Sequence, residues 1–205
     1  MTGLTNQAKV LSDSQLRALL RLVETETRFP ERNRVVVLLS FKAGLRAKEI
    51  AGVTWGMLTD AEGNLADAVA LSNVATKGRS GRVIPLHPEL KAALDALRLY
   101  ETTTKERKCA AADFVVRLKN GASDAVTRSN SVQFLFKDWF GRLGFSGASS
   151  HSGRRTFITK AARKVSEVGG SLRDVQALAG HASIQITQRY VDTDPAAQRK
   201  LIGLL

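Results

Sequence analysis

Apolar residues recur at helical spacing near the start of the chain. Four of them lie three or four positions apart, as one face of a helix requires: Leu16, Leu19, Leu20 and Val23. Ser12 or Asp13 can cap this helix. The apolar run VVVLLSF belongs to a second predicted helix, from Glu31 to Ala43, which follows Pro30 and ends at Gly44.

The helical period disappears from Trp55 to Leu86, and a β-hairpin is predicted there. AVALSN and RVIPL have the composition of strands, and the glycines and serine of VATKGRSGR favour a turn between them. The predicted tip carries Lys77, Arg79 and Arg82. A basic tip of this kind either enters a DNA groove or is simply a solvated loop, and the hairpin alone does not decide between the two.

Helical patterns dominate the remainder of the chain. Helices are predicted from His87 or Pro88, over 128–143, from a cap at Ser149, Ser150 or Ser152 to about Val165, in SLRDVQALAG, in SIQITQRYV and in the C-terminal DPAAQRKLIGLL. FVVRL is predicted as one more short strand. Phe134, Phe136, Trp139 and Phe140 are interpreted as core residues, since aromatic residues at helical spacing usually pack inside. The predicted fold class is α+β, mainly helical with a small antiparallel sheet. It forms one domain over 1–205, with residues 1–10 as a loose lead-in.

The charge balance narrows the class of partner. Thirty-one Lys and Arg residues against nineteen Asp and Glu give a net charge of +12, which is typical of a protein that binds nucleic acid. Cys109 is the only cysteine, so no internal disulfide can form, and a cytoplasmic location is expected. The longest apolar run, Val35 to Leu39, is far below the roughly twenty residues that span a bilayer, so no membrane association is expected.

The stretch from His151 to Tyr190 concentrates groups that handle phosphate. His151 and Arg154 lie three apart at a predicted helix start, where an anion is favoured and a guanidinium can hold two phosphate oxygens. His181 follows a glycine at a turn, and Tyr190 lies nine residues further on. No cluster of metal-ligating residues accompanies them, so cationic side chains would have to stabilise the charge that a reacting phosphate develops.

Arg46 and Glu49 lie three apart among apolar neighbours, in GLRAKEI. The pair shares a face if a short helix starts here. On spacing alone, an ordinary surface ion pair explains them equally well.

Taken together and in order, GLRAKEI, TKGRSGRVIPL, HSGRRTF and LAGHASIQITQRYVD resemble the motifs of the tyrosine recombinase family, also called phage integrases. The resemblance runs from about Leu11 to the C-terminus and implies the catalytic fold of that family. It implies that Arg46 and Arg154 bind the scissile phosphate and that Glu49 steadies Arg46. Lys77 would be the general acid, although Arg79 is its rival in the hairpin. His151 would assist proton transfer, His181 would hydrogen-bond the phosphate, and Tyr190 would attack it. The DNA-contacting residues implied are Arg79, Arg82, Arg155 and Arg189.

The same resemblance implies a site-specific recombinase that needs no metal or other cofactor. Its partners would be double-stranded DNA, further copies of the chain in a tetramer, and accessory DNA-bending proteins. Arg155 stands where many members carry histidine, and the chain begins where the catalytic domain normally begins, without the N-terminal core-binding domain. Two other functions stay open: relaxation of DNA by a type IB topoisomerase, and DNA binding without catalysis. The C-terminal segment would dock either on a neighbouring subunit or on its own domain.

Overall fold

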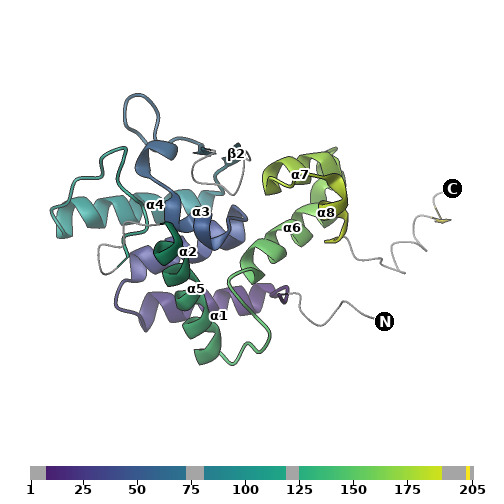
Figure 1. Ribbon diagram of the computed structural model, residues 1–205, viewed down its shortest axis with the longest axis horizontal. Coiled ribbons are helices and arrows are strands. Elements are labelled where there is room, and N and C mark those ends of the chain that lie inside the picture. The colour runs from purple at the N-terminus through teal and green to yellow at the C-terminus, as the bar shows by residue number, and fades with distance from the viewer. Residues whose placement is uncertain (1–7, 73–80, 119–124, 191–201, 204–205) are drawn as a thin grey trace.

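A computed structural model describes residues 8–72, 81–118, 125–190 and 202–203. Within these ranges the fold is mainly helical, with one two-stranded antiparallel sheet (Figure 1). The helices and strands in chain order are α1 Asp13–Thr25, α2 Pro30–Lys42, α3 Ala47–Gly52, β1 Ala68–Leu71, β2 Arg82–Pro85, α4 Pro88–Leu99, α5 Ala125–Arg142, α6 Ser152–Lys164, α7 Leu172–Ala179 and α8 Ile184–Gln188. The predicted fold class is confirmed.

Local signals fix most helix ends. At the start of α1, the Gln15 amide donates to Ser12 Oγ at 3.2 Å while the Ser12 amide donates to Gln15 Oε1 at 2.9 Å, so the two residues cap the helix reciprocally. Gly44 follows α2 with φ +65°, a left-handed conformation that glycine adopts without strain. The predicted beginning of α1 and end of α2 are therefore confirmed.

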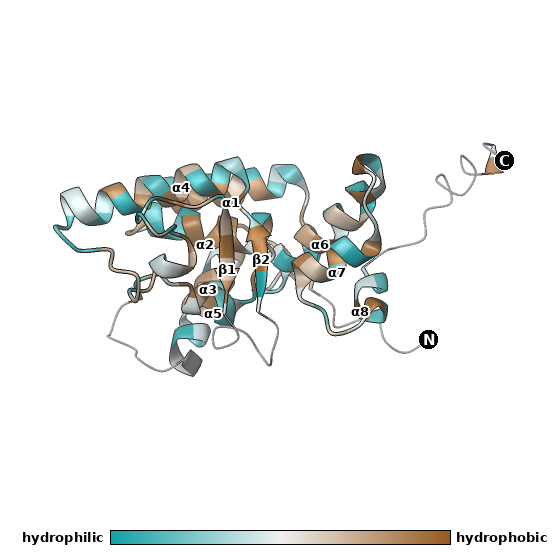
Figure 2. Ribbon diagram, turned by 90° about the horizontal axis from the view of Figure 1, so that it is seen from above, coloured by the Kyte–Doolittle hydropathy of each residue, from teal (hydrophilic) through white to brown (hydrophobic). Residues whose placement is uncertain are grey.

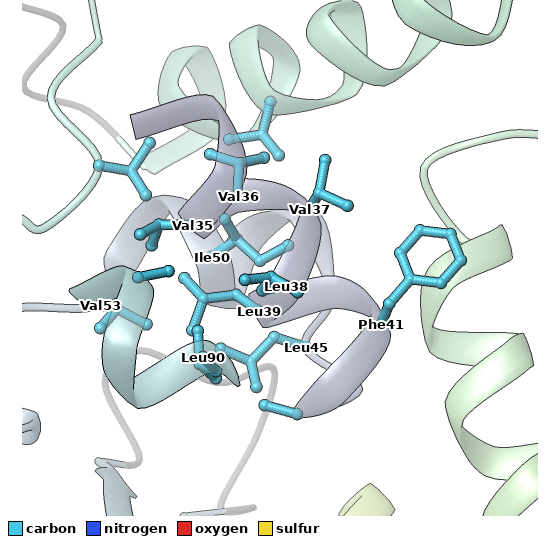
Figure 3. Packing of buried hydrophobic residues seen from close by; sticks show 14 of the residues in the cluster. Val35, Val36, Val37, Leu38, Leu39, Phe41, Leu45, Ile50, Val53 and Leu90 are labelled. Atoms are coloured by element: carbon cyan, nitrogen blue, oxygen red, sulfur yellow. The ribbon is translucent and has the colours of Figure 1, made fainter. Parts of the chain in front are cut away.

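The main hydrophobic core is built around α2. Its central residues Val35, Val36, Val37, Leu38 and Leu39 are all fully buried, and Figure 3 shows Ile50, Val53 and Leu90 packed close to them. Helix α2 packs against α1, α4 and α6, and α3 packs against α5. An apolar helix with no exposed face is thus enclosed by its neighbours, as its sequence requires.

A second, smaller cluster lies in the C-terminal part of the described chain. It contains the buried Ile158, Val175 and Ala179, with Phe157 and Tyr190 among the partly buried residues packed against it. Figures 1 and 2 both show α6, α7 and α8 grouped at one side of the molecule. Helix α6 connects this group to α2, and α7 contacts β2.

The predicted β-hairpin forms as expected in its two strands. Strand β1 pairs with β2 in the register Ala68↔Pro85 to Leu71↔Arg82. Val69 and Ile84 lie opposite each other and are buried, and the strands are coloured mostly as apolar in Figure 2. The tip, residues 73–80, lies outside the described residues, and with it Lys77 and Arg79.

Two sequence predictions are wrong. FVVRL forms no strand: Phe114 makes only an isolated bridge with Thr54, because the partner segment turns at once into the short 3-10 helix Trp55–Met57. Phe134 is 68% exposed, whereas the other three predicted aromatic core residues of α5 are buried. Phe134 lies two residues from Phe136, and at about 100° per residue this places it on the opposite face.

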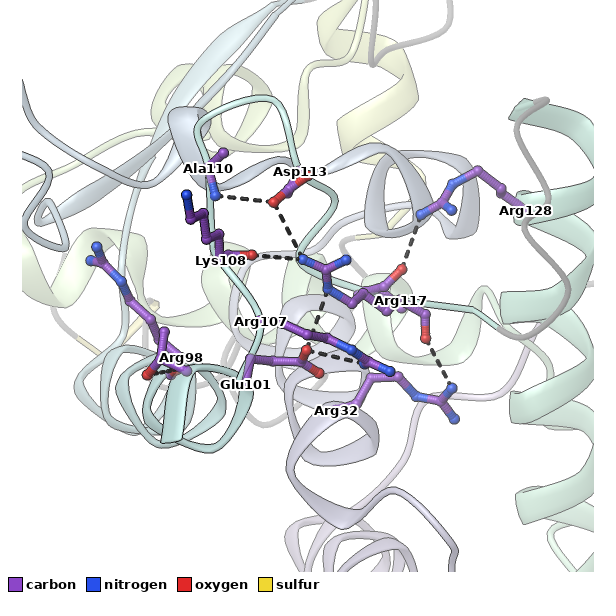
Figure 4. A network of polar contacts seen from close by, with 11 residues as sticks. Arg32, Arg98, Glu101, Arg107, Lys108, Ala110, Asp113, Arg117 and Arg128 are labelled. Atoms are coloured by element: carbon purple, nitrogen blue, oxygen red, sulfur yellow. Dashed lines mark hydrogen bonds and ion pairs between the residues drawn. The ribbon is translucent and has the colours of Figure 1, made fainter. Parts of the chain in front are cut away.

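A polar network ties the far end of α3 to its surroundings. Arg128, on α5, donates from Nη2 to the Ala51 carbonyl at 2.8 Å and to the Val116 carbonyl at 3.0 Å (Figure 4). Its guanidinium also lies 3.7 Å from the centre of the Phe114 ring. Helix α3 is therefore held at its carboxyl end by a buried arginine.

In the described ranges no helix is long and apolar enough to cross a membrane.

Candidate active site

Helix α3 presents Arg46 at its amino end. Glu49 accepts from the Arg46 amide at 2.8 Å and from Arg46 Nη1 at 2.9 Å, so a single carboxylate caps the helix and fixes the arginine. Glu49 is 1% exposed while the Arg46 side chain is 30% exposed. The ordinary surface ion pair that the spacing left open is thereby excluded, because one partner is buried.

Glu49 stays ionised despite its burial. Burial raises the pKa of this carboxyl, but the hydrogen bond and charge of Arg82, followed by those of Arg46, lower it more, so the pKa lies below the usual value. A buried anion with two arginine partners is a rigid anchor for both of them.

Arg154 projects from the first turn of α6 and is buried. Its Nη1 donates to the Gly44 carbonyl at 2.7 Å and its Nη2 to the Ala179 carbonyl at 2.6 Å. Burial, then the charge of Arg46, lowers the pKa of Arg154 to about 10, so the group remains cationic at neutral pH. The guanidinium has five N–H groups, and these two bonds leave three for a ligand.

His181 follows the left-handed Gly180 that ends α7. It is 8% exposed, and its Nδ1 lies 2.9 Å from Thr187 Oγ1 on α8. Burial, then the positive charges of Arg154, Arg46 and Arg82, lowers its pKa to about 4. The imidazole is therefore neutral at pH 7. Three cations within electrostatic reach show that α3, β2 and α6 converge here.

Tyr190 lies two residues after the end of α8. Its ring stacks on His181, with centroids 5.5 Å apart and planes 23° apart, and the Arg155 guanidinium lies 5.8 Å from its centroid. The ring is partly buried against the small C-terminal cluster. The predicted nucleophile and its histidine neighbour are thus brought together, while Arg189 is exposed.

His151 is the residue directly before α6. The residue is exposed at the surface. Partial shielding of its ring, then the charges of Arg154 and Arg46, lowers its pKa below the usual value. Since a lower pKa favours the neutral imidazole, His151 can accept a proton at neutral pH.

Arg82 does not lie where the sequence predicted. It is the first residue of β2, opposite Leu71, and not part of the tip. Its side chain is 6% exposed and its guanidinium faces Glu49. The placement of Arg82 at a solvent-facing tip is therefore corrected, because a buried carboxylate holds it against the body of the protein.

Sequence reasoning missed Thr187 as well as the partners of Arg82. Thr187 is fully buried in the last turn of α8 and lies three residues before Tyr190. The spacing of three residues could have indicated that Thr187 lies near Tyr190, but it did not identify His181 as the residue that Thr187 contacts. The distance in sequence from Arg82 to its partners gave no signal at all.

A hollow of about 840 Å³ bordered by α1, α2 and α5 contains none of the predicted site residues. Among residues whose placement the structure describes, no three His, Cys, Asp or Glu side chains gather as metal ligands would.

Comparison with known proteins gives two kinds of relative. Curated relatives include a XerD tyrosine recombinase of Neisseria meningitidis serogroup B, 29% identical over 189 residues, and a XerC of Syntrophus aciditrophicus, 25% identical over 182 residues. These alignments cover 90% and 88% of this chain but 58% and 55% of the relatives. The chain thus spans a little over half the length of these relatives.

Solved structures share the fold at lower identity. The Tn1549 transposon integrase matches with a TM-score of 0.70 and 20% identity, covering 100% of this chain and 68% of that one. The XerA recombinase matches with a TM-score of 0.64 and 20% identity, covering 100% of this chain and 66% of that one. The model of the phage integrase family matches residues 9–197. The chain therefore belongs to the phage integrase family of tyrosine recombinases.

Proposed function

We propose that this protein is a site-specific DNA recombinase in which Tyr190 cleaves a DNA strand through a covalent 3′-phosphotyrosine intermediate. The supporting observation is the convergence of Arg46, Arg154 and His181, with the Tyr190 ring stacked on His181. These groups come from segments up to 144 residues apart in the chain, and the fold brings two arginines and a neutral imidazole together with a tyrosine.

Arg46 and Arg154 are proposed to hold the non-bridging oxygens of the scissile phosphate. Arg46 donates one side-chain hydrogen bond to Glu49, and its side chain is 30% exposed. Its remaining N–H groups are therefore accessible to a ligand. Arg154 keeps three N–H groups beyond its two backbone bonds. Fixed cations of this kind stabilise the charge that develops in the transition state.

His181 is proposed to act as a neutral hydrogen-bond donor. With the Thr187 hydroxyl donating to Nδ1, the ring proton resides on Nε2, which is then free to donate to a phosphate oxygen. The low pKa of His181 suits this role because the ring stays neutral throughout the neutral pH range.

The chemical step is proposed as follows. The Tyr190 oxygen bonds to phosphorus, its proton passes towards His151, and the bond from phosphorus to the 5′ oxygen breaks. Lys77 delivers a proton to that oxygen, leaving a 5′ hydroxyl and a 3′-phosphotyrosine. A 5′ hydroxyl from another strand reverses the step, so neither ATP nor metal is consumed. Metal independence is part of the proposal.

The proposed partner is double-stranded DNA, in agreement with the net charge of +12. Solved relatives in fold include the Tn1549 integrase in complex with circular intermediate DNA and XerH bound to its palindromic difH substrate. Arg79, Arg155 and Arg189 remain predicted DNA contacts.

A tetramer on DNA, with accessory DNA-bending proteins, is the proposed assembly. Most of the C-terminal segment that would link subunits lies outside the described residues. Sedimentation of the chain with and without residues 194–205 tests that link. Unchanged self-association after truncation would argue against docking on a neighbour.

A nicked suicide substrate tests the chemistry. Because the target site is unknown, the substrates are fragments of the DNA that flanks the coding sequence. The wild-type chain should form a covalent protein–DNA adduct and Tyr190→Phe should not. The chain contains one other tyrosine, Tyr100, so Tyr100→Phe is the matched control and should form the adduct normally. An adduct that persists in Tyr190→Phe would sink the assignment of the nucleophile.

A further inference from the structure

Arg82 donates a hydrogen bond from each of its three guanidinium nitrogens to an acceptor within the protein. Its Nη1 and Nη2 donate to Glu49 Oε1 and Oε2 at 3.0 and 3.1 Å, and its Nε donates to the Leu178 carbonyl at 2.9 Å. All three nitrogens are engaged and the side chain is 6% exposed. A bidentate arginine–carboxylate pair is among the strongest polar contacts in proteins. Because a carboxylate neutralises its guanidinium, whereas the two hydrogen bonds of Arg154 go to backbone carbonyls, Arg82 is poorly placed to bind a phosphate.

The three bonds join three separate segments. Glu49 lies 33 residues before Arg82 and Leu178 lies 96 residues after it. The side chain thus connects β2, which emerges from the hairpin carrying Lys77, to α3 with Arg46 and to α7, which ends just before His181.

Arg82 also shapes the carboxyl end of α7. The last carbonyls of a helix lack partners within the helix and carry partial negative charge. Here Leu178 accepts from Arg82 and Ala179 accepts from Arg154. Two guanidinium groups therefore secure consecutive carbonyls at the turn from which His181 emerges.

Gly180 shows how closely this turn lies against Arg82. A Cβ built on Gly180 would be 2.9 Å from Arg82 Nη1 and 3.0 Å from Arg82 Cδ, and the residue has φ +61°. Glycine is needed both for the left-handed backbone and for the close approach.

We propose that Arg82 is a positioning residue of the DNA-cleavage site, which orients Arg46 through Glu49 and fixes the turn carrying His181 without itself binding the phosphate. The proposal rests on the proposed function, since it assigns Arg82 a part in the same site.

The electrostatics of Glu49 provide a signature of this role. From the described elements around it, Glu49 faces three cations: Arg46 of α3, Arg82 of β2 and Arg154 of α6. In Arg82→Gln the burial that raises the pKa of Glu49 remains, while the largest interactions that lower it are lost. Glu49 then takes up a proton as the pH falls, and its hold on Arg46 weakens.

The test measures single-turnover cleavage of bound suicide substrate in wild type, Arg82→Gln, Arg82→Lys and Glu49→Gln. We expect Arg82→Gln to slow cleavage by about 10- to 100-fold at neutral pH, as small misplacements of catalytic groups do. DNA affinity in a mobility-shift assay should change little. The deficit should widen as the pH is lowered towards about 5.5, where carboxyls of raised pKa titrate.

Arg82→Lys separates charge from geometry. It keeps a cation beside Glu49 but lacks the planar fork that reaches both carboxylate oxygens and Leu178. Its deficit should be intermediate and depend less on pH. Glu49→Gln has no carboxyl at this position to titrate. The ratio of its cleavage rate to that of wild type should therefore not change with pH. Arg32→Gln, in the first turn of α2, is the matched control for loss of a partly buried arginine with backbone and amide partners, and should leave the pH profile unchanged.

Two results would overturn the proposal. One is a loss of DNA affinity in Arg82→Gln with unchanged cleavage of bound DNA, which would make Arg82 a DNA contact. The other is a deficit that is the same at every pH, which would make its role merely structural. A wild-type chain that forms no adduct refutes the proposed function instead. In that case the ¹³C titration of the Glu49 carboxyl decides: an unchanged midpoint in Arg82→Gln and Arg82→Lys rejects the Arg82–Glu49 link.

Discussion

At Gly153, α6 lies against α2 with no room for a side chain, and replacing this glycine with alanine should disturb both stability and the site. A Cβ at Gly153 would be 2.8 Å from Ser40 Cβ and from Phe41 Cδ2, and closer still to Ser40 Oγ. Ser40 is fully buried, so it has no open space into which to move. Either α6 or α2 must shift, and Arg154 is the next residue along α6.

The magnitude follows from two opposing terms. Overpacking a close-packed interior typically costs about 1–3 kcal/mol. Replacing glycine by alanine within a helix returns at most about 1 kcal/mol. The net effect of Gly153→Ala is a loss of up to about 3 kcal/mol, and for a chain of this size each kcal/mol lowers Tm by roughly 2–4 °C.

Gly141 of α5 provides the control. It lies in a helix, but a Cβ there would meet nothing within 4 Å. Gly141→Ala should therefore gain about 0.5–1 kcal/mol from helix propensity alone. Thermal unfolding followed by circular dichroism should show the two variants moving Tm in opposite directions. A Gly153→Ala variant as stable as Gly141→Ala would refute the close packing of α6 on α2.

Three further outcomes are expected. Phe136→Ala should lower the free energy of unfolding by about 3–5 kcal/mol, because the ring is fully buried, while Phe134→Ala should change it by no more than about 0.5 kcal/mol in the same urea titration. The free energy of unfolding should fall as the pH drops from 6.5 towards about 4, because unfolded His181 takes up a proton there and folded His181 does not; His181→Gln should weaken this dependence, to which His151 and His87 also contribute, in urea titrations at several pH values. A substrate with sulfur at the 5′ bridging position needs no proton on its leaving group, so it should restore cleavage by Lys77→Ala and give no such gain to Arg79→Ala. Restoration in Arg79→Ala instead would exchange the two roles.

Short-range signals made much of the fold predictable. The cap at Ser12, the left-handed glycine after α2 and the composition of the hairpin strands depend on neighbours within a few residues, and each prediction is confirmed. The spacing of aromatic residues in α5 was less informative. It indicates an apolar helix but does not show which face of the helix is buried. The error at Phe134 has this cause.

The residues of the candidate site could be predicted from the sequence, but the contacts between them could not. Motif order named Arg46, Arg154, His181 and Tyr190, whose roles stay predictions. The sequence could not show that Arg82 faces Glu49, since a basic residue near a turn is equally consistent with solvent and with a buried carboxylate. Contacts between residues 33 and 96 positions apart are decided by tertiary packing.

The division of the hydrophobic residues into a large and a small cluster has an energetic consequence for Tyr190, the proposed nucleophile. Arg46 and Glu49 are anchored in the large core, whereas Tyr190 rests on a satellite with three buried members, Ile158, Val175 and Ala179. Regions with few buried apolar contacts open at a lower free energy than the molecule as a whole. Amide protons of α7 and α8 should therefore exchange with solvent ahead of those of α2. Opening of α8 is therefore expected to displace Tyr190 at a lower free energy than unfolding of α2 and α3 displaces Arg46.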